Sequence, residues 1–295
     1  MREDVVFSSG GVDLAGWLFT PGDDGKKRPA IVMAHGFSCV KEQGLEPFAR
    51  CFAAAGFVVL VFDHRCFGAS GGEPRGRLFP LDQVEDYACA LTWLAQRPEV
   101  DPERLGVWGT SFSGGVVLRL AAGDRRVRAV VAQVPSVVNA GNSAFMERGE
   151  NGILTQLIRL AESAPDAFGS GEGTIPVTAG EGDIGVLAVP EALAMYRSPE
   201  WSVPSWRGRI TVDSLEKIRD FDATVGIEGS APAAILMIAA ERDSLIPPDL
   251  VRRAYERAGE PKELRILPCG HFDVYRPPWR DKAAGLAAAW FERFL

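Results

Sequence analysis

The 295-residue sequence lacks a basic excess and a long apolar run. Its 32 Lys and Arg residues are outnumbered by 39 Asp and Glu residues, which gives a net charge of −7. The basic residues are dispersed, so the sequence predicts no phosphate-neutralising face and no nucleic-acid partner. The longest nearly apolar stretch, residues 231–240, is about half as long as a bilayer span requires. We therefore expect no membrane span.

Cysteine and histidine are scarce as well. The five cysteines are an odd number without a CxxC pair, which favours reduced thiols in a cytoplasmic protein over a disulfide framework. The charged residues 1–4 contain no apolar signal segment, which agrees with this location. No HxH, HExxH or GxxxxGK[ST] motif is present, so no metal or nucleotide cofactor is expected. Only His35, His64 and His271 could serve as an imidazole base.

The residues that are present indicate a globular α/β protein. Apolar residues make up 46% of the chain, enough for a sizeable core. After a hairpin at 4–20, apolar strand-like runs alternate with helical patterns, which is typical of βαβ units and a mostly parallel sheet with helices on both faces. The predicted strands are 30–34, 57–62, 104–108, 127–132, 233–239 and 263–267, and the predicted helices are 47–55, 81–96, 112–122, 249–258 and 281–295.

The alternation stops between residues 136 and 230. Two helical faces occur there, at 153–161 and 212–221, with a predicted hairpin near 175–189 in a Gly/Pro-rich tract. We interpret 136–230 as a cap or lid inserted over the sheet, and 1–135 together with 231–295 as the core domain.

Two serines lie in or near a Gly-x-Ser-x-Gly pattern, which acts as a tight turn from a strand to a helix. Ser70 has the perfect match, but its strand ends several residues earlier and a loop follows. Ser111, in Gly-Thr-Ser-Phe-Ser, comes two residues after a buried strand and opens a helical run. We therefore predict Ser111 as the nucleophile, although Ser113 stands where glycine is usual. If Ser113 were the nucleophile of the motif, the turn would begin too many residues after the strand.

A serine hydroxyl needs an adjacent base. In enzymes with this turn, the acid and then the histidine follow the serine in the chain. His271 is the only histidine after Ser111, and it comes just past the last predicted strand. The acid should follow the strand after the insertion, where Asp243 is our prediction and Glu241 the alternative. The carboxylate would hold the tautomer of the imidazole and stabilise its cation.

The loop after the first parallel strand supplies further candidates. Main-chain N–H groups of Phe37 and Phe112 would face the developing oxyanion. His35 is interpreted as a residue that shapes this loop. His64 is either part of a loop ion pair or cap, or a substrate contact.

The sequence resembles the α/β-hydrolase superfamily in four stretches, at 34–42, 62–72, 109–115 and 270–273. These stretches are most similar in sequence to dienelactone-hydrolase-like and X-Pro dipeptidyl-peptidase-like serine hydrolases. The resemblance covers essentially the whole chain and implies the α/β-hydrolase fold. Two departures limit what it implies. Dienelactone hydrolases use a cysteine where this chain has Ser111, and the peptidases supply a tyrosine hydroxyl to the oxyanion from a loop where this chain has Phe37.

The predicted function is hydrolysis of a carboxylic ester, thioester or lactone through an acyl-enzyme on Ser111. The alternative is an acyltransferase or a polyketide or peptide chain-release enzyme with the same triad, and a third hypothesis is a non-catalytic binding protein of this fold. The partner would be a small-molecule acyl substrate, and the sequence leaves the oligomeric state open. Residues of the insertion are candidates to line an apolar acyl pocket or to form the insertion's own core: Phe145, Met146, Leu154, Leu157, Trp201 and Trp206.

Overall fold

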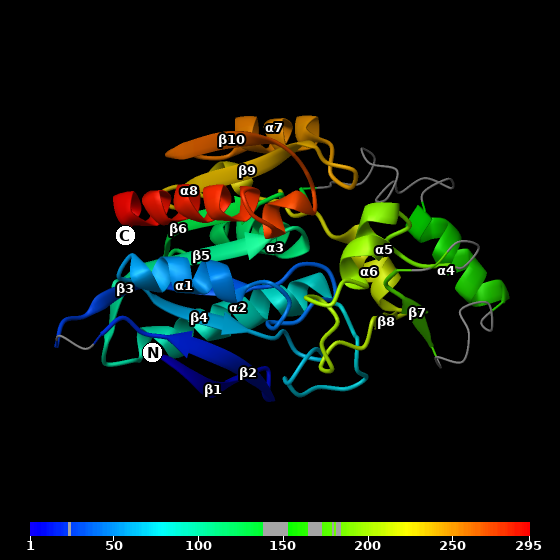
Figure 1. Cartoon of the computed structure of the whole chain (residues 1–295), viewed down its shortest axis with the longest axis horizontal. Helices are drawn as coiled ribbons and strands as arrows, with labels where there is room; N and C mark the ends of the chain where they lie inside the picture. Colours follow the sequence, from blue (N-terminus) through cyan, green and yellow to red (C-terminus); the bar gives the residue numbers. More distant parts are fainter. Residues whose placement is uncertain (23–24, 138–152, 165–172, 179, 181–183) are drawn as a thin grey trace.

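The computed structural model describes residues 1–22, 25–137, 153–164, 173–178, 180 and 184–295. An eight-stranded sheet runs through the molecule in the order β1-β2-β4-β3-β5-β6-β9-β10 (Figure 1). Its strands are β1 (Arg2–Ser9), β2 (Val12–Phe19), β3 (Arg28–Ala34), β4 (Val58–Phe62), β5 (Val100–Thr110), β6 (Val127–Gln133), β9 (Ala234–Arg242) and β10 (Lys262–Gly270). β1 and β2 form the predicted antiparallel hairpin. The other six strands of this sheet are parallel to one another, in the order β4, β3, β5, β6, β9 and β10. The predicted α/β fold is confirmed.

Helices cover both faces of the sheet, which explains why the central strands are continuous apolar runs. α1 (Glu46–Ala54) and α8 (Trp279–Phe294) contact each other on one face, and α2 (Pro80–Ala95) and α3 (Phe112–Ala121) contact each other behind the sheet (Figure 1). α7 (Pro248–Arg257) packs on β9 and β10, and the short helix η3 (Asp273–Tyr275) links β10 to α8. All five helices predicted for the core are present, displaced by a few residues at most.

The strand order reverses between β3 and β5. From β3 the chain moves to β4 on one side and then crosses to β5 on the other side. Such a reversal leaves a crevice at the carboxyl ends of the two strands, where ligands bind in open α/β sheets. The loops that follow β3, β5, β9 and β10 therefore meet at one edge of the sheet.

Beyond this edge lie the elements between β6 and β9 (Figure 1). They are α4 (Ile153–Ser163), β7 (Thr174–Pro176), α5 (Pro190–Tyr196), β8 (Arg209–Thr211), α6 (Ser214–Asp220) and the short helix η2 (Ile227–Gly229). α4 and α6 confirm the two predicted helices. The predicted hairpin near 175–189 forms only in part: the Val186 and Leu187 amides donate to the Pro176 and Val177 carbonyls at 3.0 and 2.8 Å, but β7 pairs antiparallel with β8, on the far side of α5. Strands of three residues are too short to display a hydrophobic period, and α5, which the sequence analysis missed, is only seven residues long.

Candidate active site

Ser111 lies in the tight turn between β5 and α3. Its backbone has φ 54° and ψ −117°, a conformation that costs a residue with a side chain about 1–3 kcal/mol. The surrounding structure holds it there: the Ser111 amide donates to the Gln133 carbonyl at 2.8 Å, and the Ser136 amide donates to the Ser111 carbonyl at 2.8 Å. Gly109 is required because a Cβ there would be 2.2 Å from the Ser113 carbonyl oxygen. The turn thus holds the Ser111 side chain at the edge of the sheet.

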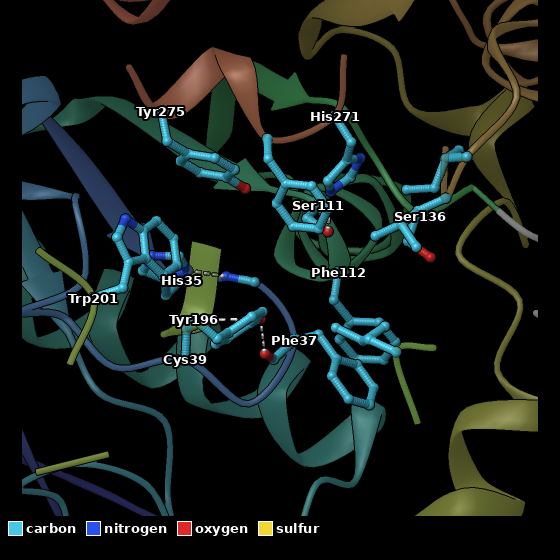
Figure 2. A pocket seen from close by; sticks show the side chains of 15 residues that line it. His35, Phe37, Cys39, Ser111, Phe112, Ser136, Tyr196, Trp201, His271 and Tyr275 are labelled. Carbon is cyan, nitrogen blue, oxygen red and sulfur yellow. Dashed lines mark hydrogen bonds between the residues drawn. The ribbon is translucent and has the colours of Figure 1, made fainter. Parts of the chain in front are cut away.

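The structure brings Ser111, His271 and Asp243 together. His271 follows β10, and its Nε2 lies 3.1 Å from Ser111 Oγ. On the other side of the ring, Nδ1 lies 2.8 Å from Asp243 Oδ2. Figure 2 shows the imidazole directly beside the serine, and the side chains of His271 and Asp243 are only 1% and 2% exposed. This arrangement allows the imidazole to accept the serine proton while the carboxylate holds the opposite ring nitrogen.

Asp243, and not Glu241, contacts the histidine. Its second oxygen, Oδ1, accepts the backbone N–H groups of Leu245 at 2.9 Å and Ile246 at 2.7 Å. Both oxygens are therefore engaged, one by the loop and one by the imidazole. The Glu241 side chain is 60% exposed beside Arg242. The choice between the two carboxylates depended on which strand-end residue points inward, which sequence spacing does not specify.

The loop after β3 passes directly beside the turn that carries Ser111. A Cβ on Gly36 would lie 2.9 Å from the Thr110 carbonyl oxygen, 3.0 Å from Ser111 Cβ and 3.6 Å from the Phe112 nitrogen. The neighbouring rings of Phe37 and Phe112 meet edge to face at 5.6 Å. Phe112 is the first residue of α3, so its N–H has no acceptor within the helix. These positions are compatible with an oxyanion site built from the two backbone amides.

His35 shapes this loop and is neutral. The Gly36 amide donates to His35 Nδ1 at 2.7 Å, so the ring proton is on Nε2, which donates to the Gln43 carbonyl. Burial lowers the pKa of His35 to about 3. The ring therefore adds an uncharged aromatic surface to the site and holds the loop at two points.

Ser113 and His64 belong to a buried network behind the loop. The Ser113 hydroxyl donates to the His35 carbonyl, and His64 Nε2 lies 3.5 Å from Ser113 Oγ. His64 Nδ1 lies 3.2 Å from Asp86 Oδ2. Burial opposes ionisation of Asp86, but the bonds from His64 and Arg65 hold the pKa of this carboxyl below its ordinary value. The serine that replaces the usual glycine thus ties the turn to the loop after β3.

A pocket opens above Ser111 and His271 (Figure 2). Apart from two serines, two histidines, a cysteine and a few backbone atoms, its walls are apolar and aromatic. The two tyrosine hydroxyls in the walls are engaged: Tyr275 pairs with Thr110 at 2.8 Å, and Tyr196 donates to the Phe37 carbonyl at 3.1 Å. The rings and aliphatic side chains that line it include Phe37, Phe112, Leu187, Tyr196, Trp201, Ile246, Phe272 and Tyr275.

Only part of the predicted substrate-contacting set reaches this pocket. Trp201 lines it, whereas His64, Leu154 and Trp206 lie outside the lining that the described residues form. The Trp206 indole instead donates to the Ser38 carbonyl at 2.9 Å. Leu154 is completely buried, and Leu157 is 7% exposed in the apolar core. Phe145 and Met146 lie outside the described residues.

Several residues that line the pocket were not predicted from the sequence. Leu245, Ile246 and Phe272 directly follow the ends of β9 and β10, so their proximity to Asp243 and His271 in the chain was a usable signal. Tyr196 is at the end of α5, and no local pattern indicates that it would point toward Phe37.

Ser70, the perfect motif match, has a structural position. Its hydroxyl donates to the Asp63 carbonyl at 2.6 Å and accepts the Ala15 amide at 2.9 Å. It therefore ties the loop after β4 to β2, as its loop context predicted.

Comparisons with known proteins agree with this geometry. Residues 10–155 match the family model described as X-Pro dipeptidyl-peptidase (S15 family). A thiohydrolase of Eupenicillium brefeldianum is 32% identical over 280 residues, covering 92% of this chain and 88% of that protein. The polyketide transferase grgF of Penicillium sp is 31% identical over 276 residues, covering 92% and 90%. The crystal structure of the α/β hydrolase GrgF from Penicillium sp. sh18 superposes with a TM-score of 0.84 at 28% identity, covering 100% of this chain and 99% of that chain.

The chain belongs to the α/β-hydrolase superfamily. The predicted resemblance, including the subgroup related to the X-Pro dipeptidyl-peptidases, is confirmed. This α/β hydrolase is an enzyme. No helix in the described parts of the hydrolase is long and apolar enough to cross a membrane. Among the same residues, no three His, Cys, Asp or Glu side chains form a group suited to a metal ion.

Proposed function

We propose that this chain cleaves an ester or thioester through an acyl-enzyme on Ser111, with His271 as general base and Asp243 as the orienting acid. The observation that carries the proposal is the chain of hydrogen bonds from Asp243 through His271 to Ser111, at the base of an apolar pocket. Three groups of the right chemical types, from three separate loops, meet within hydrogen-bonding distance, and the serine is held in a strained turn.

In the proposed first half-reaction, the Ser111 oxygen attacks the substrate carbonyl carbon while its proton passes to His271 Nε2. The bond from that carbon to the leaving oxygen or sulfur then breaks, and the imidazolium returns the proton to the leaving group. Water repeats the sequence on the acyl-enzyme and releases the carboxylic acid. Asp243 stabilises the imidazolium in both halves through its 2.8 Å contact with Nδ1.

The negative charge on the tetrahedral oxygen needs donors that are already in position. We assign this role to the backbone N–H groups of Phe37 and Phe112. Support comes from the close approach of Gly36 to Ser111 and Phe112, which leaves no room for a side chain at position 36.

The walls of the pocket favour an apolar, uncharged acyl group. No Lys, Arg or Glu side chain is among the described lining residues, and the aromatic hydroxyls named above are engaged within the protein. The printed name of one relative, a thiohydrolase, supports a thioester as the bond that is cleaved.

Acyl transfer is the second candidate, and it is supported by a relative named polyketide transferase. The same acyl-enzyme would then pass its acyl group to an alcohol, amine or carbon acceptor instead of water. Analysis of products with and without candidate acceptors distinguishes transfer from hydrolysis.

We also propose that residues 136–230 act as a cap over a core of 1–135 and 231–295. Four of its residues, Ser136, Leu187, Tyr196 and Trp201, contribute to the pocket wall, which supports this division. The cytoplasm remains our proposed location, on the sequence grounds given above.

The test uses Ser111→Ala with Ser70→Ala as the matched control. Ser111→Ala should lower turnover of an activated ester or thioester by roughly 10⁴–10⁶-fold and abolish labelling by a fluorophosphonate. Ser70→Ala should keep the label, because its hydroxyl lies in a separate loop. Equal labelling of wild type and Ser111→Ala would contradict the proposal, and absence of an adduct in the wild type would favour the non-catalytic binding protein.

A further inference from the structure

The loop after β3 contains a tight turn from Gly36 to Cys39. The Cys39 amide donates to the Gly36 carbonyl at 3.3 Å, and Ser38 has a φ of 58°. A positive φ at the third residue of a turn is characteristic of type II and normally favours glycine. In the alternative type I turn, the Phe37–Ser38 peptide is turned over, and Ser38 avoids the left-handed region. The residue present at position 38 therefore opposes the turn that is observed.

Two side chains from the insertion hold this peptide unit in place. The Tyr196 hydroxyl donates to the Phe37 carbonyl at 3.1 Å, which is the group that would point elsewhere in the other turn (Figure 2). The Trp206 indole donates to the next carbonyl, that of Ser38, at 2.9 Å. The two rings stack on each other with centroids 5.0 Å apart. Together they contact consecutive carbonyls of one turn.

The Tyr196 hydroxyl is suited to act as a permanent donor. It is fully buried, and burial raises its pKa well above the ordinary value, so the phenol keeps its proton. The Cys39 thiol donates to the same oxygen at 3.1 Å, which leaves the phenol proton for Phe37.

We propose that Tyr196 and Trp206 are positioning residues that hold the Gly36–Cys39 turn closed, with Ser38 at its positive φ, and thereby keep the Phe37 amide in place for the oxyanion. The inference rests on the proposed function, because it concerns the same oxyanion site. The Gly36 carbonyl and the Phe37 N–H belong to one trans peptide and point in opposite directions, so the closed turn fixes the direction of this N–H. A donor that is already fixed in place is what makes an oxyanion site effective. The insertion would then complete the catalytic machinery as well as cover it.

The alternative is that Tyr196 acts by touching the substrate, since its ring lines the pocket. The positive φ of Ser38 allows these two roles of Tyr196, positioning the turn and binding the substrate, to be distinguished. If Tyr196 serves to stabilise a positive φ, glycine at position 38 should make the hydroxyl dispensable, because glycine adopts this conformation freely. If Tyr196 binds substrate, the residue at position 38 should not matter.

The experiment is a double-mutant cycle on Tyr196→Phe and Ser38→Gly, with kcat and KM measured on an activated ester. We expect Tyr196→Phe to lower kcat about tenfold with little change in KM in the serine background, the effect of losing one buried hydrogen bond. In the glycine background the same change should lower kcat by no more than about twofold. Tyr275→Phe is the matched control, because its hydroxyl pairs with Thr110 and its effect should be the same in both backgrounds.

Trp206→Phe keeps a ring but removes the indole donor. Like Tyr196→Phe, it should lower kcat in the serine background and much less in the glycine background. This variant replaces Tyr196→Phe in the experiment if the tyrosine variant does not fold. Thermal midpoints of all variants separate unfolding from loss of positioning. An equal loss in both backgrounds, or no loss at all, would overturn the inference while leaving the acyl-enzyme intact. Turnover that does not depend on Ser111 would instead overturn the proposed function, and the inference with it.

Discussion

Asp243→Asn probes the hydrogen-bond chain most sharply, because the loop dictates how the new amide must lie. Asp243 Oδ1 accepts two backbone N–H groups, from Leu245 and Ile246, while Oδ2 faces His271 Nδ1. An asparagine has one oxygen and one NH₂ group. Its oxygen should stay with the two backbone donors, so its NH₂ group should face the imidazole. Nδ1 must then accept, which places the ring proton on Nε2, toward Ser111. In this tautomer His271 cannot accept the serine proton.

The magnitude follows from what restoring the productive tautomer would require. Turning the amide over leaves two backbone donors facing an NH₂ group, and an unsatisfied buried donor costs about 1–3 kcal/mol. For two donors the sum is about 2–6 kcal/mol, which corresponds to a productive fraction lower by roughly 30- to 30,000-fold. We therefore expect kcat to fall within that range, while the fold is preserved because the side chain keeps its shape.

The assay is steady-state turnover of an activated ester by Asp243→Asn, with Glu241→Gln as the control. Glu241→Gln also replaces a carboxylate by an amide, two residues earlier at the end of β9, but its side chain is exposed and the change should leave kcat unchanged. A loss of kcat clearly smaller than about 30-fold in Asp243→Asn, with an unchanged thermal midpoint, would contradict this orientation of the amide.

Two further predictions concern the loop after β3. Gly36→Ala places a Cβ 2.9 Å from the Thr110 carbonyl oxygen, so the loop must move, and kcat should fall about 10²–10³-fold, as for loss of one oxyanion donor. Gly285→Ala, where nothing lies within 4 Å of the new atom, is its control, and comparable kcat for the two variants would contradict this prediction. Burial lowers the pKa of His35 from 6.5 to about 3, so this residue should make the free energy of unfolding depend on pH. Between these values the unfolded chain binds a proton that the folded chain does not, so the free energy of unfolding should fall as the pH drops below 6.5, by up to about 1.4 kcal/mol per pH unit. Urea titrations at pH 5 and 6.5 measure this slope, which His35→Gln should reduce by that amount; an identical slope in both proteins would count against a neutral, buried His35.

Local patterns were sufficient for most of the fold. Apolar runs such as 58–62 predict strands covered on both faces, and the helices between them have a clear 3.6-residue period, so the alternation predicts a parallel sheet. The insertion was harder, because β7 and β8 are three residues each and pair across an intervening helix. A pairing between short segments depends on the packing around them, which a local pattern does not contain.

The order of residues along the chain was enough to predict which chemical groups stand at the ends of the strands. Ser111, Asp243 and His271 each come just after a predicted β-segment, and parallel strands bring their carboxyl ends to one edge. The folded chain was needed to show which of two carboxylates turns inward and that Ser113 and His64 lie behind the site. It was also needed to show that Tyr196 contacts the main chain of a loop 159 positions away. The difference lies in the distance along the chain over which the responsible interactions act. Strand and helix formation depends on neighbours a few residues apart, whereas the direction of a side chain at a loop is set by hydrogen bonds and packing partners that only the folded chain brings near.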